Sequence, residues 1–387
     1  MIGWSPQVVK VLSWATIIWI IVFIVGRLFP GLRKWGITIG PFYVMFRVRR
    51  FVSFLDWMAS RNRLAWLVFL EASIPLGIGQ MLFAYYWLSR NLIGLIIPRG
   101  GGAPVYPLIP GITIGPSALK YFIPAILVIL VTHECAHGVA ARLGHIRIRS
   151  MGVIVAFLML GAFVEPDEEE LERAPLRVKL RVLSAGSAAN LLVGLMLLLL
   201  TGALFIQTPS GIVVVGTLEG YPAHGKIAPF SVIIELNSTK VNSVAELAEF
   251  MKNSTPGSRI IVRLIDPTGA PRVVILKLAP RPDDSTKGFM GIRIADYNPP
   301  RIPMPPRVSL ELMWLLMWTH MLCLSAAILN MLPIYPFDGG RIMFMLTDEY
   351  IKNRTVNMGI KSLLTVSSAA LLIVNMILTL IKFSIPT

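Results

Sequence analysis

The stretch P-A-I-L-V-I-L-V-T-H-E-C-A-H-G-V, residues 124–139, is an apolar run that contains two histidines and a glutamate. Its composition is that of a membrane-spanning helix, where ionisable side chains are costly and usually present for function. His133 and His137 are four residues apart, so they lie on one helix face, about one turn from each other. Two imidazoles placed this way can bind one zinc ion, and Glu134 lies beside it as a proton acceptor. The alternative is that both histidines are polar contacts between helices or lie at the membrane surface.

The composition of the whole chain agrees with a membrane protein. Of its 387 residues, 55% are hydrophobic and only 15% are charged, which is rare in a soluble domain. The net charge of +15 fits basic cytoplasmic loops, and no aromatic-plus-basic motif indicates a nucleic-acid partner. Both cysteines lie in apolar runs, so no disulfide framework is expected.

Apolar runs long enough to cross about 30 Å of hydrocarbon predict a polytopic α-helical membrane protein with about six transmembrane helices. The first run is longer than the core of a signal peptide and is expected to be retained as a span. Residues 31–63 are interpreted as an interfacial strand-like or amphipathic piece, and 90–116 as an external loop or re-entrant segment. The predicted spans are 7–29, 64–89, 117–141, 181–206, 309–333 and 358–383.

Residues 207–298 have a different pattern. Short β-type runs such as G-I-V-V-V-G and R-I-I-V-R-L alternate with turn residues, and one helical pattern, V-A-E-L-A-E-F-M, lies among them. This pattern predicts a small soluble β-rich domain inserted between the fourth and fifth spans. The chain therefore divides into a membrane domain at 1–206, the inserted domain at 207–298 and a second membrane part at 299–387.

Basic residues predict the orientation, because cytoplasmic loops are enriched in Lys and Arg. The loop 142–180 is rich in arginine, and the stretch 30–63 is strongly basic. Six spans would then place both termini and the β-rich domain outside the cytoplasm, with the two histidines near the cytoplasmic side. The basic residues of the first loop are Arg33, Lys34, Arg47, Arg49, Arg50, Arg61 and Arg63.

A catalytic zinc needs a third protein ligand and an open position for water. Asp338 is the best candidate, in N-M-L-P-I-Y-P-F-D-G-G-R, residues 330–341. It follows the fifth span on the same predicted side of the membrane as His133. Two prolines before it break the helix, and two glycines after it let the backbone turn. The alternative is that D-G-G is merely a turn after a span.

These motifs together resemble a known family. H-E-C-A-H, then G-S-A-A-N at 186–190, then N-M-L-P-I-Y-P-F-D-G-G are similar in order and spacing to the site-2 protease family of intramembrane zinc metalloproteases. The chain resembles an archaeal-type member with a PDZ-like insertion, over about residues 117–383. It departs from the family pattern at Phe337, where leucine is usual, and at Ser187 and Ala188, where the middle motif usually has proline.

The resemblance implies an intramembrane zinc endopeptidase of the cell membrane. Such an enzyme hydrolyses peptide bonds within or next to transmembrane segments of single-span membrane proteins, the process called regulated intramembrane proteolysis. One Zn²⁺ per chain would be bound by His133, His137 and Asp338, with Glu134 as the general base toward a zinc-activated water. No small-molecule cofactor beyond zinc is expected, and the partners are the lipid bilayer and the single-span substrates.

Further residues are candidates for substrate binding. Asn190 and Asn330 would hydrogen-bond the substrate backbone or the oxyanion, although Asn190 equally suits helix packing. A β-prone run bounded by glycines would accept the unwound substrate as an added strand, or would form a re-entrant hairpin that only closes the site. The residues of this run are Gly152, Val153, Ile154 and Val155.

Two other classes of function are weighed against a protease. A catalytically silent scaffold or adaptor would act through the PDZ-like domain, and a missing ligand would favour it, but all three ligands and the base are present. A transporter or zinc permease would need several intramembrane charges along a pathway, or inverted repeats. The sequence shows neither feature.

Overall fold

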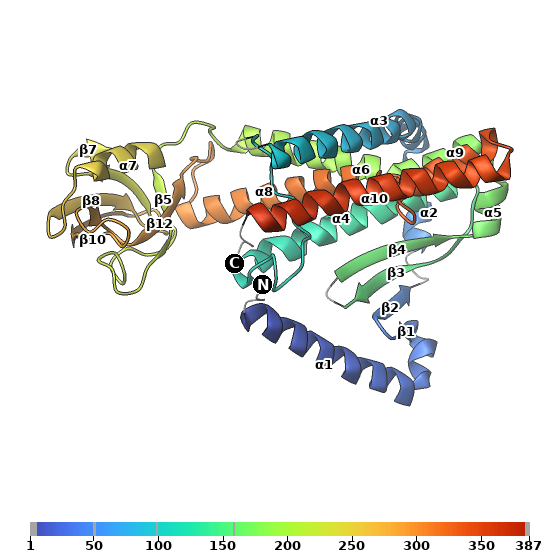
Figure 1. Cartoon of the computed structure of the whole chain (residues 1–387), viewed down its shortest axis with the longest axis horizontal. Helices are drawn as coiled ribbons and strands as arrows, with labels where there is room; N and C mark the ends of the chain where they lie inside the picture. Colours follow the sequence, from blue (N-terminus) through green and yellow to red (C-terminus); the bar gives the residue numbers. More distant parts are fainter. Residues whose placement is uncertain (1–5, 49–51, 98–99, 158, 384–387) are drawn as a thin grey trace. The chain divides into compact units, whose positions relative to one another are not determined.

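The computed structural model of the chain describes residues 6–48, 52–97, 100–157 and 159–383 (Figure 1). Arg49, Arg50 and both chain termini lie outside these ranges. The chain forms two compact units, Met1–Leu195 with Trp318–Thr387, called the membrane unit, and Met196–Met317, called the β-rich unit. The β-rich unit is longer than the predicted domain at 207–298, because it also includes the end of the long helix before that domain and the start of the long helix after it.

Five helices of the described residues are long and apolar enough to cross a membrane, and they coincide with the second to sixth predicted spans. The protein is therefore a polytopic helical membrane protein. The first predicted run forms α1 (Pro6–Leu28), whose apolar part, Leu12–Leu28, is shorter than a full span, so the number six stays a prediction. The five helices are α3 (Arg63–Ile96), α4 (Pro116–Leu143), α6 (Leu176–Leu204), α8 (Pro306–Leu329) and α10 (Arg354–Lys382).

Helix α3 continues seven residues past the predicted end at 89, because its polar residues are paired with α10. Asn91 is buried, and its Nδ2 donates to Asn375 Oδ1 at 2.9 Å and to the Ala103 carbonyl at 3.0 Å. The Ala103 N–H donates back to Asn91 Oδ1 at 2.7 Å. A buried amide with all these partners is compatible with a helix interior in lipid.

A four-stranded antiparallel sheet belongs to the membrane unit, in the order β1-β2-β3-β4. Its strands are β1 (Ile37–Ile39), β2 (Tyr43–Val48), β3 (Ile148–Ala156) and β4 (Met159–Pro166). The segment 31–63 thus contributes two strands, the short helix η1 (Pro30–Trp35) and the helix α2 (Val52–Arg61). Strand β4 packs against α4, and its outer side is an edge of the sheet.

The sheet order corrects one prediction. Strand β3 pairs with β2 on one side and with β4 on the other, so that Val153 lies between Phe46 and Ala162. The expected edge pairing of a substrate with Gly152, Val153, Ile154 and Val155 is therefore wrong, because both edges of β3 are occupied. The edge strands of this sheet are β1 and β4, and β4 is the one that packs against α4, the helix of the two histidines.

The acidic run after β4 makes ion pairs with arginines of β3 and the preceding turn. Asp167 caps α5 (Glu168–Arg173), where its Oδ1 accepts the Glu170 N–H at 3.2 Å. That hydrogen bond and the Arg149 guanidinium, 3.1 Å away, lower the pKa of the Asp167 carboxyl. Glu170 in turn pairs with Arg147.

The β-rich unit is built on an antiparallel sheet in the order β12-β5-β6-β8-β9, with β7 paired to β6. One face packs with α7 (Val244–Lys252) around a buried aliphatic core that includes Ile233, Val262 and Leu276. The runs G-I-V-V-V-G and R-I-I-V-R-L correspond to β5 and β8, and the helical pattern corresponds to α7, whereas β12 was not predicted. The strands are β5 (Ile212–Thr217), β6 (Val232–Leu236), β7 (Thr239–Lys240), β8 (Arg259–Ile265), β9 (Pro271–Lys277), β10 (Ala279–Pro280), β11 (Gly288–Phe289) and β12 (Ile292–Asp296).

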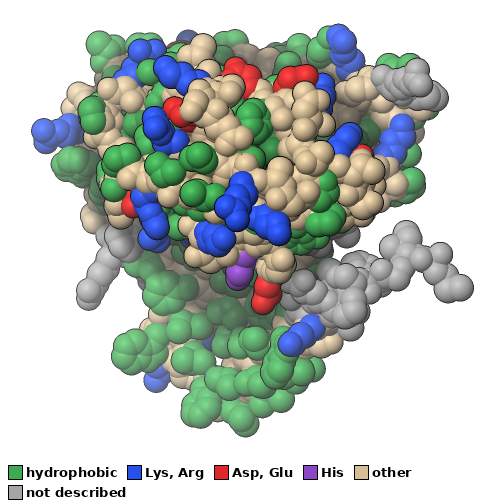
Figure 2. Space-filling model, turned by 90° about the vertical axis from the view of Figure 1, so that its left-hand side faces the viewer, with side chains coloured by type: hydrophobic (Ala, Val, Ile, Leu, Met, Phe, Trp, Pro, Cys, Tyr) green, Lys and Arg blue, Asp and Glu red, His purple; other side chains and the backbone are tan. Residues whose placement is uncertain are grey.

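The surface of the β-rich unit is mixed in character. Figure 2 shows Lys and Arg side chains interspersed with hydrophobic ones, and few acidic side chains, on the drawn face. A groove of about 230 Å³ runs between α7 and β12 and is lined by Leu247, Met251, Phe289 and Ile292 among others. Lys252, Arg281 and Lys287 also line it, and each of them is paired with a nearby carboxylate.

Candidate metal centre

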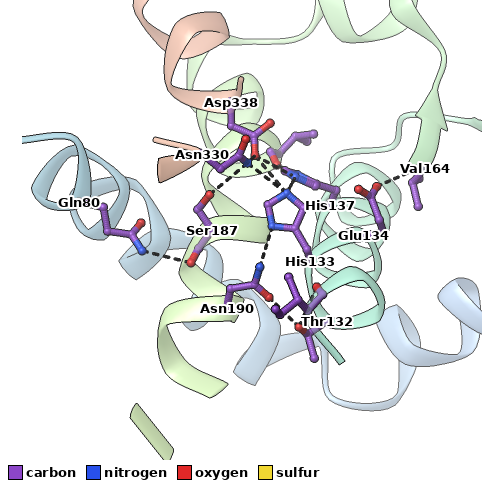
Figure 3. Close-up of polar contacts among 12 residues, drawn as sticks. Gln80, Thr132, His133, Glu134, His137, Val164, Ser187, Asn190, Asn330 and Asp338 are labelled. Atoms are coloured by element: carbon purple, nitrogen blue, oxygen red, sulfur yellow. Dashed lines mark hydrogen bonds and ion pairs between the residues drawn. The ribbon is translucent and has the colours of Figure 1, made fainter. Parts of the chain in front are cut away.

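Three predicted ligands meet in the membrane unit (Figure 3). His133 and His137 lie one turn apart on α4, and Asp338 is the first residue of α9 (Asp338–Tyr350). The Nε2 atoms of the two histidines are 3.0 Å apart, and Asp338 Oδ2 lies 3.4 Å from His133 Nε2 and 3.1 Å from His137 Nε2. The carboxylate is buried, and both imidazoles are more than four-fifths buried. These three side chains form a group that can hold a metal ion.

The loop after α8 brings Asp338 to the histidines. Helix α8 ends at Leu329, and the chain folds back so that the Gly339 N–H donates to the Asn330 carbonyl at 3.0 Å. A Cβ on Gly339 would lie only 2.1 Å from the Met331 carbonyl oxygen, so only glycine fits this approach. The turn predicted at D-G-G is therefore wrong in position. The chain reverses over 330–337, and both glycines belong to the first turn of α9.

Helix α6 closes the group from a third side through Gly186, the first residue of the predicted middle motif. A Cβ on Gly186 would lie 2.4 Å from His137 Nε2 and 2.7 Å from His133 Cε1. The missing side chain leaves room beside the imidazoles that any other residue would fill. The glycine of G-S-A-A-N thus serves the site by close approach of the backbone.

The donor set fits zinc. Tetrahedral zinc holds imidazole nitrogen and carboxylate oxygen at about 2.0–2.2 Å, which separates the ligand atoms from one another by roughly 3.3 Å. The observed separations of 3.0, 3.1 and 3.4 Å agree with this value. Two imidazoles and one carboxylate are also the ligand chemistry of known catalytic zinc sites, which keep a fourth position open.

The outer nitrogen of His137 fixes its tautomer. His137 Nδ1 lies 2.6 Å from the Val182 carbonyl oxygen, an acceptor only, so Nδ1 carries the proton and donates to it. The lone pair of Nε2 then faces His133 and Asp338. This is the arrangement that orients a metal-binding histidine.

The outer nitrogen of His133 faces an amide. Asn190 Nδ2 is placed 3.3 Å from His133 Nδ1, and Thr132 Oγ1 lies 2.7 Å from Asn190 Oδ1. Oxygen and nitrogen of an amide are interchangeable in such an assignment. A turned amide would present Oδ1 to a protonated Nδ1, and Thr132 would then accept from Asn190 while its hydroxyl donates to the Val128 carbonyl at 2.8 Å. Only this orientation frees His133 Nε2 for a metal.

Asn330 contacts the group from the α8 side. Its Nδ2 donates to Asp338 Oδ2 at 2.7 Å and lies 3.2 Å from His133 Nε2 and 3.4 Å from Ser187 Oγ. The sequence predicted Asn190 and Asn330 as contacts to substrate or oxyanion. The structure places both next to the ligands, where they orient His133 and Asp338.

Glu134 points toward the sheet (Figure 3). Its Oε2 accepts the backbone N–H of Val164 in β4 at 2.7 Å. The predicted base thus connects the helix of the two histidines with the edge strand.

Four residues of the site escaped the sequence analysis as contributors: Gln80, Thr132, Val164 and Val182. Gln80 is buried in α3 and donates to the Ser187 carbonyl at 3.1 Å, which fixes α6 near the motif. An amide inside a predicted span is a signal that sequence alone offers for Gln80. Val164 and Val182 contact the site through backbone atoms, so their side-chain types give no indication of this role in the sequence.

Comparison with known proteins places the chain in a family. The model of peptidase family M50 matches residues 121–375, more than half of the chain, and this range contains the whole metal group. An uncharacterized protein of the archaeon Methanocaldococcus jannaschii is 26% identical over 267 residues, which cover 67% of this chain and 65% of the relative. The match therefore spans just under two thirds of that relative.

Two solved structures are similar to part of the chain. The PDZ domain of an SdrC-like protein from Listeria innocua is 17% identical and covers 22% of this chain and 96% of its own, with a TM-score of 0.21. The corresponding domain from Listeria monocytogenes is 19% identical and covers 22% and 90%, also with a TM-score of 0.21. Scores this low leave the PDZ-like prediction open. The family match and the motifs along 121–375 do not depend on them, and they show that the chain belongs to peptidase family M50, the site-2 protease family.

Proposed function

We propose that the protein is an intramembrane zinc endopeptidase that hydrolyses peptide bonds within or next to the transmembrane segments of single-span membrane proteins. The main support is the group of His133, His137 and Asp338, with Glu134 beside it, in which both histidines and Glu134 come from a helix of membrane-spanning length. Family membership agrees with this chemistry. A scaffold would not need three ionisable side chains inside a span together with the buried Asp338 carboxylate next to them.

The residues have separate roles in this proposal. His133, His137 and Asp338 would hold one Zn²⁺, which when bound lowers the pKa of water and polarises the scissile carbonyl. Glu134 takes the proton from the attacking water and later gives it to the leaving amine. Asn190 and the Val182 carbonyl keep both imidazoles in the binding tautomer, and Asn330 orients the Asp338 carboxylate.

The open edge of β4 is the proposed position of the unwound substrate. In an antiparallel sheet, alternate residues direct their N–H and C=O groups to opposite sides. The Val164 N–H points away from β3, toward Glu134, so Ala162 and Leu160 present their backbone groups along the same open edge. A peptide added here as a strand would pass next to Glu134.

The sidedness of this reaction is also proposed. The basic loops support an active site near the cytoplasmic side, with the β-rich unit and both termini extracytoplasmic. Cysteine labelling with a membrane-impermeant reagent at Lys240 of the β-rich unit, in intact cells, tests this assignment. Labelling only after the cells are opened would show that the β-rich unit is cytoplasmic and that the proposed orientation is wrong.

The decisive variant is Glu134→Gln. The amide keeps the shape of the side chain but cannot accept the proton, and general acid–base catalysis is typically worth about 10² to 10⁴ in rate. We expect near-normal zinc content and cleavage that is at least about a hundredfold slower. The assay is cleavage of a tagged single-span substrate in detergent, with zinc measured on the same preparation. Near-normal turnover would refute the metalloprotease mechanism.

One observation favours a second function, a scaffold that binds peptides through the β-rich unit. The apolar groove between α7 and the edge strand β12 has the form of a peptide site. The two functions are separated by the same assay. A scaffold would leave the substrate uncut even with wild-type protein that is fully loaded with zinc.

A further inference from the structure

The second face of the sheet in the β-rich unit is only partly covered. Along β8 the residues alternate, with Ile260, Val262 and Leu264 in the core and Ile261 on the other face. Ile261 pairs across the strands with Ile275 of β9. On this second face Ile261, Val273 and Ile275 are 50%, 59% and 58% exposed, which makes an apolar stripe on a surface.

Cations border the stripe. Arg259 and Lys277 are directly opposite each other in the register of β8 and β9, and both are exposed. Like charges in this position destabilise a sheet. No ion pair is described for either residue, whereas Arg263 on the same face lies 3.4 Å from Glu235. The Arg259–Lys277 pair is therefore a place where an external anion would relieve repulsion.

The same face receives the start of α8. Ile265, the last residue of β8 on this face, belongs to a cluster with Val232 in which Leu310 and Met313 of α8 are packed. Helix α8 is long and apolar enough to span the membrane. The face that carries the apolar stripe is thus continuous with the start of a helix of membrane-spanning length.

We propose that this face, Arg259, Ile261, Val273, Ile275 and Lys277, docks on the headgroup region of a bilayer that contains anionic phospholipid. The aliphatic stripe enters the interface, and the two cations bind lipid phosphates. The lipid is favoured over a protein partner because the spans tether the unit at the membrane surface. Docking would hold the β-rich unit down on the bilayer, and it does not rest on the protease activity.

A fluorescent label on the full-length protein tests the docking. Ile275→Cys carries an environment-sensitive fluorophore, and Glu249→Cys on α7, on the core side of the sheet, is the matched control. The native cysteines are buried, and the labelled parent protein gives the background. In nanodiscs of phosphatidylcholine with phosphatidylglycerol, we expect a blue shift and quenching by lipid-borne quenchers at position 275 and neither at 249.

The charge variant Arg259→Glu with Lys277→Glu tests the cations. Each basic residue near an anionic surface contributes roughly a fivefold change in the docking equilibrium, so quenching should fall to the level found in pure phosphatidylcholine. A water-exposed label at 275 in both kinds of disc overturns the proposal. So does a shielded label that lipid quenchers do not reach but that crosslinks to a second copy. Unchanged quenching in the charge variant overturns the role of the two cations.

Discussion

Asn190 decides which nitrogen of His133 faces the other ligands. An imidazole that ligates through Nε2 must keep its proton on Nδ1, and the Asn190 amide, 3.3 Å from Nδ1, supplies the acceptor when it is turned so that Oδ1 faces the ring. Thr132 holds this amide from its other side. The residue is therefore a positioning residue for the ligand, in addition to a contact between α4 and α6.

We predict that Asn190→Leu weakens zinc binding by about 10- to 100-fold, the usual loss when an outer-shell partner of a ligand is removed. Asn190→Asp keeps an acceptor at His133 Nδ1 and should retain zinc. Zinc affinity by competition with a chelator, measured on both variants in detergent, checks this. Equal affinity of the leucine variant and the wild type would show that Asn190 only packs the two helices.

At the scale of elements, the edge strand β4 is the feature that relates substrate to catalyst. Its outward backbone groups lie in line with the Val164 N–H that Glu134 accepts. The substrate strand is proposed to pair with β4 because β3 has no open side. A change in one outward N–H of β4 should therefore affect the substrate and leave the metal group unaffected.

We predict that Ala162→Pro lowers kcat/KM roughly tenfold, the value of about one backbone hydrogen bond, while zinc content stays constant. Proline removes the outward N–H and is tolerated on an edge strand. Ala162→Gly keeps the N–H and should cleave almost as the wild type does. An equal loss in both variants would assign the effect to the side chain and exclude strand addition at Ala162.

The elements also show what the sequence alone could establish. The long helices were predictable because apolar runs of span length have few alternatives, and H-E-x-x-H fixes two ligands by helical spacing. The position of β3 in the middle of its sheet was not predictable from the sequence. Its neighbour β2 lies about a hundred residues earlier, and only long-range pairing decides the strand order. The end of α3 was missed for a similar reason, because Asn91 is satisfied by Asn375 of α10.

The role of Asn190 could not be predicted from the sequence either. Hydrogen bonding to a ligand and packing between helices use the same residue at the same spacing, and only the position of His133 Nδ1 separates them. Gly339 was predicted to turn the chain, but its closeness to the Met331 carbonyl shows that it permits packing of the loop. The motifs identified the residues of the site, but the contacts between them could be seen only in the structure.

At the scale of the whole molecule, the β-rich unit is an insertion whose two ends meet. Phe205 pairs with Pro300 in an antiparallel bridge, and the Ile206 N–H donates to the Pro299 carbonyl at 2.9 Å. The unit contains its own core and contributes no residue to the metal group. We therefore expect it to control access of substrates with large external portions, without a part in the chemistry.

We predict that replacing residues 207–298 by a short Gly-Ser linker preserves cleavage of a substrate whose external portion has been removed. The same deletion should speed cleavage of the untrimmed substrate, which the intact protein rejects. The measurement is the ratio of the two cleavage rates, for the deletion and for the wild type. Loss of activity on the trimmed substrate, with zinc retained, would contradict a gating role.

The paired ends of the insertion have a consequence for how this chain can change. The bridge at Phe205 and Pro300, with the Arg301 N–H donating to the Leu204 carbonyl at 2.8 Å, ties the entry and exit strands together at their base. These backbone contacts set the distance between the end of α6 and the segment that leads into α8. That distance does not depend on the residues inserted between them. An inserted segment of another length or sequence can therefore replace this one without moving the helices. Substrate specificity can then diverge in evolution while the catalytic helices are unchanged.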